Sequence, residues 1–169
     1  ENVAVLDGAD AWTYGTLNER SNQLANYLLA RGIPRQSVIA VMGHRSAPLI
    51  WGLLGILKAG AAFTILDPSY PDARLLEYLN AVEPSGFLQL EAAGKLSSAV
   101  QEYIDSLPLH CHLLLRRSGS VGVTELGIET DEILQDVPVS DPSVEIDADS
   151  LAYIAFTSGS TGKAKGILG

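Results

Sequence analysis

The residues best suited to chemistry form one loop near the end of the sequence, at positions 157–166. These ten residues, TSGSTGKAKG, contain four hydroxyl side chains, three glycines and two lysines. Glycines let backbone amides approach an anion closely and form a concave nest, while hydroxyls donate hydrogen bonds and lysines add positive charge. The composition predicts a loop that holds the phosphates of a nucleotide. The alternative is a Ser/Gly-rich turn whose lysines are only solvated.

Two familiar motifs do not account for this loop. A P-loop requires glycine five residues before Gly162, where Thr157 stands, and Ser or Thr after Lys163, where Ala164 stands. Ser160 and Lys163 have the S-x-x-K spacing of an acylated serine, but the companion S-D-N and K-T-G motifs do not occur in the sequence. A G-x-G-x-x-G fingerprint does not occur either, which excludes dinucleotide binding by that route.

The loop must be positioned by the elements around it, and the sequence alternates strand-like and helix-like segments. An unbroken apolar run, typical of a strand buried on both faces, occurs at 38–42, mainly apolar strand segments occur at 63–66 and 152–156, and weaker strand candidates occur at 87–90 and 111–115. Helical periodicity or helix-start signals indicate helices at 16–31, 46–58, 70–83 and 92–107. This alternation predicts an α/β fold, a mostly parallel sheet covered by helices. Ligands of such sheets collect where strands end, as the loop does.

Two stretches depart from this alternation. Between 116 and 150 the pattern is lost and Ser, Gly, Asp and Pro dominate, so we expect a long surface excursion there. After the loop we expect a helix that covers the sheet, but only three residues follow Gly166. We therefore expect a piece of a larger domain that stops just past the loop.

Composition excludes several classes of protein. The 169 residues are 47% hydrophobic and 18% charged, which is typical of a folded chain. The net charge of −9 disfavours a general nucleic-acid-binding surface. The longest apolar run, 49–57, is about half a membrane span, and the N-terminal residues lack a signal-peptide pattern. With one cysteine, Cys111, these features predict a cytoplasmic protein with no nucleic-acid or membrane partner.

Two other groups of residues have structural explanations. His110, Cys111 and His112 lie in a predicted strand, where the two histidines face one side and the cysteine faces the other, so no metal site is predicted. Gly52 and Gly55 lie three apart on the second predicted helix. We expect them to let that helix pack closely against the sheet.

Three segments together resemble the adenylate-forming superfamily, which contains acyl-CoA synthetases, luciferases and the adenylation domains of nonribosomal peptide synthetases. YIAFTSGSTGKAKG at 153–166 resembles the phosphate-binding core motif of that superfamily. LKAGAAFTILDP at 57–68 resembles the second core motif of peptide synthetase adenylation domains, and WTYGTL at 12–17 resembles the segment that opens the fold. The three segments occur in the order that the superfamily has and together span nearly the whole sequence.

A narrower similarity is to fungal-type α-aminoadipate reductases, which join adenylation, carrier and reductase domains in one chain. It is carried by ILDPSYPDAR at 65–74 and EAAGKLSSAVQEYIDSL at 91–107. Two residues depart from the patterns. Thr161 stands where those reductases often have an acidic residue, and Ala164 stands where the superfamily usually has proline, which restores a backbone N–H to the loop.

The resemblance implies that residues 1–169 are the N-terminal portion of an AMP-binding adenylation domain, part of its large N-terminal subdomain, truncated just after the phosphate-binding loop. It implies that ATP is bound by Thr157, Ser158, Gly159, Ser160, Thr161, Gly162 and Lys165. The hydroxyls and backbone amides would donate hydrogen bonds to the β- and γ-phosphates, the glycines would allow the backbone to approach them closely, and Lys165 would neutralise the phosphate charge. Lys163 lies at a variable position. Mg²⁺ would accompany ATP, but its protein ligand and every catalytic residue would lie beyond Gly169.

The implied reaction is attack of a carboxylate on the α-phosphate of ATP, giving an acyl-adenylate and pyrophosphate. The acyl group of a carboxylic or amino acid would pass to a phosphopantetheine thiol. In a reductase, NADPH would then reduce it; these two cofactors would belong to downstream carrier and reductase domains. Three hypotheses remain open: a fragment of a reductase-type adenylating enzyme, a fragment of an ordinary peptide synthetase, and a non-catalytic nucleotide- or phosphate-binding module. As a fragment, the chain alone is expected to be inactive.

Overall fold

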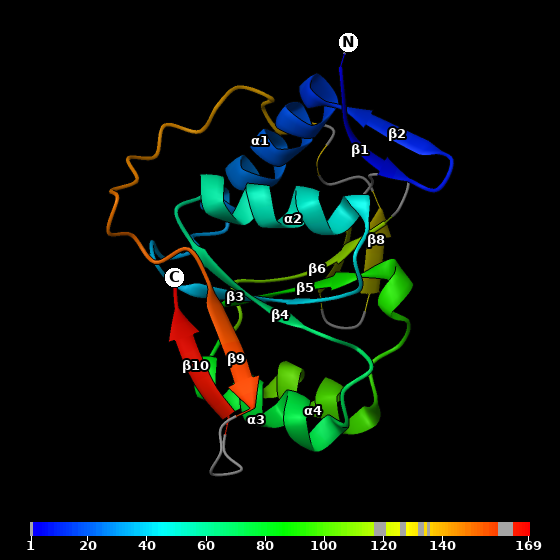
Figure 1. The fold of residues 1–169 in the computed structure, drawn as a ribbon, viewed down its shortest axis with the longest axis vertical. Helices are drawn as coiled ribbons and strands as arrows, with labels where there is room; N and C mark the ends of the chain where they lie inside the picture. The colour runs from blue at the N-terminus through cyan, green and yellow to red at the C-terminus, as the bar shows by residue number, and fades with distance from the viewer. Residues whose placement is uncertain (1, 117–120, 126–127, 132–133, 135, 159–163) are drawn as a thin grey trace.

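A six-stranded sheet occupies the centre of the molecule (Figure 1). The computed structural model describes residues 2–116, 121–125, 128–131, 134, 136–158 and 164–169. The strand order is β4-β3-β5-β6-β7-β8. The first four strands of that order are parallel: β4 (Ala62–Leu66), β3 (Val38–Met42), β5 (Gly86–Leu90) and β6 (Cys111–Leu115). The prediction of a mostly parallel sheet is confirmed.

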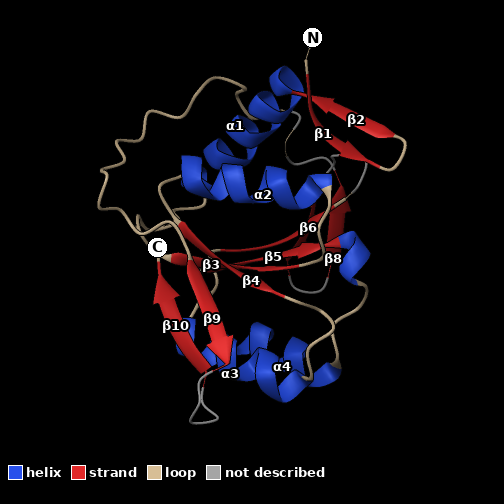
Figure 2. Ribbon diagram, in the orientation of Figure 1, coloured by secondary structure: helices blue, strands red, loops and turns tan. Residues whose placement is uncertain are grey.

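Helices cover both faces of this sheet (Figure 2). α1 (Tyr14–Ala30) and α2 (Ala47–Lys58) lie on one face, and α3 (Asp72–Val82) and α4 (Ser98–Ser106) on the other. Successive residues of β3 serve the two resulting cores. Ile39 and Val41 pack with the α1 and α2 side, whereas Ala40 and Met42 pack with the α3 and α4 side. Burial on both faces is why β3 is an unbroken apolar run.

Local signals set most helix ends. The Thr13 hydroxyl accepts a hydrogen bond from the backbone N–H of Thr16 at 3.1 Å and caps α1, which therefore begins at Tyr14, before the predicted start at residue 16. Gly32 and Gly60 follow α1 and α2 with φ of +74°, a left-handed conformation that glycine adopts without strain. In the described residues no helix is long and apolar enough to cross a membrane.

The predicted helix at 92–107 is wrong in its first half. Glu91–Ala93 form one 3₁₀ turn, and α4 begins only at Ser98. The side chain of Ser97 accepts a hydrogen bond from the backbone N–H of Val100 at 3.3 Å, which caps the helix at that point. Leu96 has the helical spacing that suggested an earlier start, but it packs against the core from the segment before the helix.

The two glycines of α2 serve two different contacts. A Cβ atom at Gly52 would lie 2.9 Å from Leu115 Cδ1 on β6, so this glycine allows close packing against the sheet, as predicted. A Cβ atom at Gly55 would lie 2.6 Å from Leu24 Cδ2 on α1. Gly55 therefore allows α2 to approach α1 rather than the sheet.

The predicted excursion at 116–150 contains two strands and a segment bound to α1. β7 (Val121–Glu125) and β8 (Ile128–Asp131) extend the sheet beyond β6 by antiparallel pairing, so this part of the predicted surface excursion consists of two strands that the lost periodicity did not predict. Their sequences, VGVTE and IETD, are short and partly polar, so they contain no apolar run from which a strand could be predicted.

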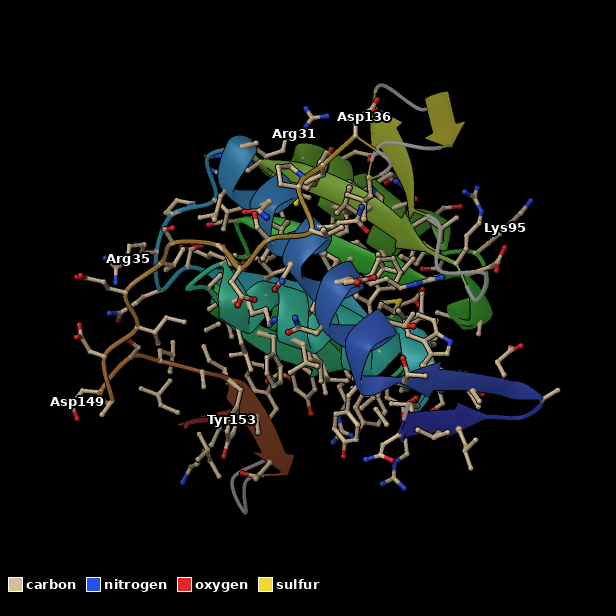
Figure 3. The ribbon with its side chains drawn as sticks, turned by 90° about the horizontal axis from the view of Figure 1, so that it is seen from above. Arg31, Arg35, Lys95, Asp136, Asp149 and Tyr153 are labelled. Atoms are coloured by element: carbon tan, nitrogen blue, oxygen red, sulfur yellow. The ribbon has the colours of Figure 1, made fainter. Side chains whose placement is uncertain are left out.

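The rest of this region, 136–150, crosses over α1 as an extended chain; Figure 3 labels Asp136 and Asp149 near its two ends. It is bound by amide side chains of α1. Asn22 donates to the Val139 carbonyl at 2.8 Å, and Asn26 donates to the Pro138 carbonyl at 2.9 Å. The segment therefore leads the chain from the β8 edge of the sheet back to the β4 edge.

Candidate phosphate-binding site

The predicted phosphate loop joins two antiparallel strands. β9 (Ile154–Ser158) pairs with β10 (Ala164–Leu168), and residues 159–163 between them lie outside the described part of the chain. The expectation of a helix after the loop is wrong, because the residues that follow it form β10. As a strand, residues 164–168 return along β9 and satisfy its backbone hydrogen bonds.

The hairpin is attached to the β4 edge of the sheet through β9. The backbone N–H of Phe63 donates to the Ala152 carbonyl at 3.1 Å, and the Thr64 hydroxyl donates to the Ile154 carbonyl at 2.9 Å. The Phe63 and Tyr153 rings stack with centroids 5.9 Å apart. Figure 3 labels Tyr153 where the chain enters β9. These contacts place the hairpin beside β4, although β9 is not a member of the central sheet.

Two of the predicted site residues are brought together by this hairpin. Thr157 on β9 and Lys165 on β10 are paired residues, and paired residues of antiparallel strands project on the same side. Both are exposed. Phe156, the residue before Thr157, projects to the other side, where its ring stacks on Tyr78 of α3. Thr157 and Lys165 therefore face away from α3, into open space.

The other predicted site residues contribute less to the described geometry. Ser158 is the last residue of β9, opposite Ala164. Gly159, Ser160, Thr161 and Gly162 fall outside the described residues, as does Lys163. The arrangement places a hydroxyl and an ammonium group on one face at the ends of the two strands that flank the Gly-rich segment. Such a pair suits an anion, since the hydroxyl can donate a hydrogen bond and the ammonium adds charge.

A second polar group lies where β3 and β4 end. The backbone N–H of Ser69 donates to the Asp67 carboxylate at 2.9 Å, and His44 Nδ1 lies 3.9 Å from the same Asp67 oxygen. The Ser69 hydrogen bonds, with a smaller contribution from His44, lower the pKa of Asp67. The Asp67 side chain thus stabilises the turn after β4, and His44 lies at the carboxyl edge of the parallel strands.

Cys111 and His112 lie on opposite faces of β6, as the strand period predicts. His110, however, precedes the strand, and its Nδ1 lies 3.3 Å from the Arg31 carbonyl at the end of α1. Cys111 is buried in the core on the α1 and α2 side, whereas the His112 ring meets Phe87, of the opposite core, edge-on at 5.2 Å. Burial raises the pKa of the Cys111 thiol to about 12 and lowers that of His112. Among the residues that the structure describes, no group of three or more His, Cys, Asp or Glu side chains could hold a metal ion.

Cys111 is expected to resist thiol reagents while the protein is folded. With a pKa of about 12, only about one thiol in ten thousand is ionised at pH 8, and the thiolate is the reacting species. Labelling with a chromogenic disulfide at pH 8 should be slow in buffer and rapid in concentrated urea, which serves as the control. Rapid stoichiometric labelling of a chain with native circular dichroism would contradict the burial of this thiol.

The fold and the hairpin define a class: α/β proteins with a mostly parallel sheet covered by helices on both faces and a Gly-rich segment between the two strands of a hairpin beside β4. Solved structures with this fold include apo MatB from Rhodopseudomonas palustris, with a TM-score of 0.73 and 20% identity over 99% of this chain and 31% of that chain. The amide bond synthetase McbA from Marinactinospora thermotolerans has a TM-score of 0.76 and 22% identity over 98% of this chain and 31% of that chain.

Residues 1–168 match the family described as AMP-binding enzyme, and the chain belongs to that family. It is 39% identical to the L-2-aminoadipate reductase of Schizosaccharomyces pombe over 99% of its length. It is 36% identical to bacitracin synthase 3 of Bacillus licheniformis, also over 99% of its length. The chain spans 12% of the first relative and 2% of the second. The resemblance to adenylate-forming enzymes is confirmed.

The sequence alone did not point to the residues that hold the hairpin in place. Thr64 and Tyr78 contact β9 across a separation of many residues; Thr64 lies within the motif-like segment 57–68 but was given no role there, and Tyr78 lies in no motif. A partial signal was available for Thr64, because a polar residue inside an apolar run is buried only with a hydrogen-bond partner. It is fully buried here.

Proposed function

We propose that residues 1–169 are the N-terminal part of an ATP-dependent enzyme that activates a carboxylate as an acyl-adenylate and transfers it to a phosphopantetheine thiol. The observation that carries the proposal is the β9–β10 hairpin, which places Thr157 and Lys165 on one face beside the Gly-rich segment. Membership of the AMP-binding enzyme family supports ATP as the nucleotide.

In this proposal the hairpin binds the triphosphate. Thr157, Ser158 and the segment from Gly159 to Gly162 donate backbone and hydroxyl hydrogen bonds to phosphate oxygens, and Lys165 neutralises their charge. Mg²⁺ would accompany the phosphates through ligands elsewhere in the enzyme. The residues of this chain contribute positioning and charge stabilisation while the carboxylate attacks the α-phosphate. No catalytic residue of the chain is assigned.

Within this function, the reductase type is the first candidate. The relatives at 35–39% identity named L-2-aminoadipate reductase include those of Schizosaccharomyces pombe and Saccharomyces cerevisiae, and in an enzyme of that kind NADPH would reduce the thioester on a separate domain. The second candidate is an ordinary peptide synthetase, which the 36% identity to bacitracin synthase 3 supports. In either case the partners are an acid substrate and downstream adenylation and carrier domains.

The test is carboxylate-dependent exchange of pyrophosphate into ATP by the longer protein that carries these residues. A panel of acids that includes α-aminoadipate separates the two candidates, because exchange that depends on α-aminoadipate alone supports the reductase type. ATP binding without exchange by any acid would instead support a non-catalytic nucleotide-binding module.

The 169-residue chain alone is proposed to be inactive, because the resemblance places the adenine and acyl pockets beyond it. Contacts to phosphate alone are screened by solvent and salt, so they give weak binding. The isolated chain serves as the second arm of the same assay. Carboxylate-dependent exchange above background by the isolated chain would show that the catalytic groups lie within residues 1–169.

A further inference from the structure

The β9–β10 hairpin is held by two side chains, Thr64 and Tyr78, to which the motif analysis assigned no role. The Thr64 hydroxyl on β4 donates to the Ile154 carbonyl at 2.9 Å, and Thr64 is fully buried. The Tyr78 ring on α3 stacks on Phe156 with centroids 4.1 Å apart and planes inclined by only 6°. Tyr78 is 4% exposed. The two contacts hold β9 at residues 154 and 156, just before the Gly-rich segment begins.

These contacts restrain different motions of the strand. The hydrogen bond from Thr64 to the Ile154 carbonyl fixes the register of β9 against β4, because a shift of one residue would place a different carbonyl opposite Thr64. The Phe156 stack fixes the rotation of β9 about its own axis, since a ring in face-to-face contact with Tyr78 cannot turn outward. Thr157 then projects away from α3, on the side that it shares with Lys165.

Such restraints matter for a site that acts by fixed hydrogen-bond donors. Donors stabilise charge most when their position is already set in the folded protein, and displacements of about 0.5 Å or more weaken the effect. Both restraints come from the central fold rather than from the hairpin. The position of Thr157 and Lys165 is therefore set by β4 and α3.

We propose that Thr64 and Tyr78 are positioning residues for the phosphate site. They act through Ile154 and Phe156 and do not themselves contact ATP. This inference rests on the proposed function for its kinetic consequence, but the attachment of the hairpin can be measured without any activity.

The kinetic experiment uses two matched pairs of variants in the complete enzyme. Thr64→Val removes the hydroxyl at nearly constant volume, and Thr64→Ser retains it. Tyr78→Leu removes the ring, and Tyr78→Phe retains it. We expect Thr64→Val and Tyr78→Leu to raise the KM for ATP in pyrophosphate exchange about threefold to tenfold, the size of one lost buried interaction, with the KM for the carboxylic acid unchanged. Thr64→Ser and Tyr78→Phe should stay within about twofold of wild type.

The structural experiment is hydrogen exchange of backbone amides in the same variants. Peptides that cover 152–158 and 164–169 should exchange faster in Thr64→Val and Tyr78→Leu, while peptides from α1 should keep wild-type protection. An unchanged KM for ATP, or equal damage by the conservative variants, would overturn the inference. If the wild-type enzyme shows no carboxylate-dependent exchange, the proposed function fails, and the hydrogen-exchange comparison alone decides: unaltered protection of the hairpin overturns the inference.

Discussion

Replacement of Trp51 by alanine is expected to lower the free energy of unfolding by about 3–5 kcal/mol, the usual cost of truncating a buried aromatic side chain. Trp51 lies on α2 and is fully buried. Its indole N–H donates to the Arg20 carbonyl of α1 at 2.8 Å, and its ring lies 6.1 Å from that of Trp12. The substitution removes the apolar contacts that Trp51 makes with α1 and with Trp12 near the N-terminus, and it leaves a cavity.

Chemical denaturation followed by circular dichroism measures this change. Trp51→Phe is the matched variant, because it keeps a ring in the core and loses the indole N–H. The Arg20 carbonyl then lacks one hydrogen bond, so a loss of about 1–2 kcal/mol is expected. A free energy of unfolding for Trp51→Ala within 1 kcal/mol of wild type would contradict the central role of this side chain. Since domains of this size are stable by only about 5–15 kcal/mol, the alanine variant is also expected to show a lower midpoint temperature.

The central strands could be predicted from the sequence because their environment is uniform. β3 and β6 run from residue 38 to 42 and from 111 to 115, as predicted; β3 is covered on both faces and is an unbroken apolar run, and β6 is apolar except for His112. The ends of α1 and α2 were predictable because Gly32 and Gly60 take the left-handed conformation after a helix. These features depend on residues close together in the sequence.

The elements that were missed depend on distant partners. β7 and β8 form the antiparallel end of the sheet, with β8 at its edge, and they are held by pairing with β6 and with each other rather than by an apolar run in their own sequences. β10 exists because it pairs with β9, so its five residues carry little signal alone. The contact from Thr64 to Ile154 spans 90 residues of sequence. The motif at 157–166 thus indicated the chemistry of the candidate site, whereas its attachment to the fold could be found only in the structure.

Substitution of Lys165 by alanine in the complete enzyme is expected to reduce kcat/KM for ATP at least tenfold, or about 1.4 kcal/mol of transition-state stabilisation. Lys165 lies in β10, where its backbone is fixed by pairing with Thr157. Because its backbone is held in a strand, Lys165 projects from a fixed position. The resemblance to adenylate-forming enzymes implies that its ammonium group contacts the triphosphate. Lys163→Ala is expected to have a smaller effect, because the family motif varies at that position.

Two further variants separate charge from strand structure in this experiment. Ile167 lies two residues further along β10, projects on the same side as Lys165 and is 51% exposed, so Ile167→Ala alters the strand without changing charge. It should leave kcat/KM for ATP within about twofold of wild type, a change of less than 0.5 kcal/mol, as for most surface substitutions. Lys165→Arg retains the charge and should restore part of the activity. Equal and small effects of Lys163→Ala and Lys165→Ala would remove Lys165 from the phosphate site. A loss with Ile167→Ala as large as that with Lys165→Ala would show that the strand, rather than the ammonium group, is what the reaction requires.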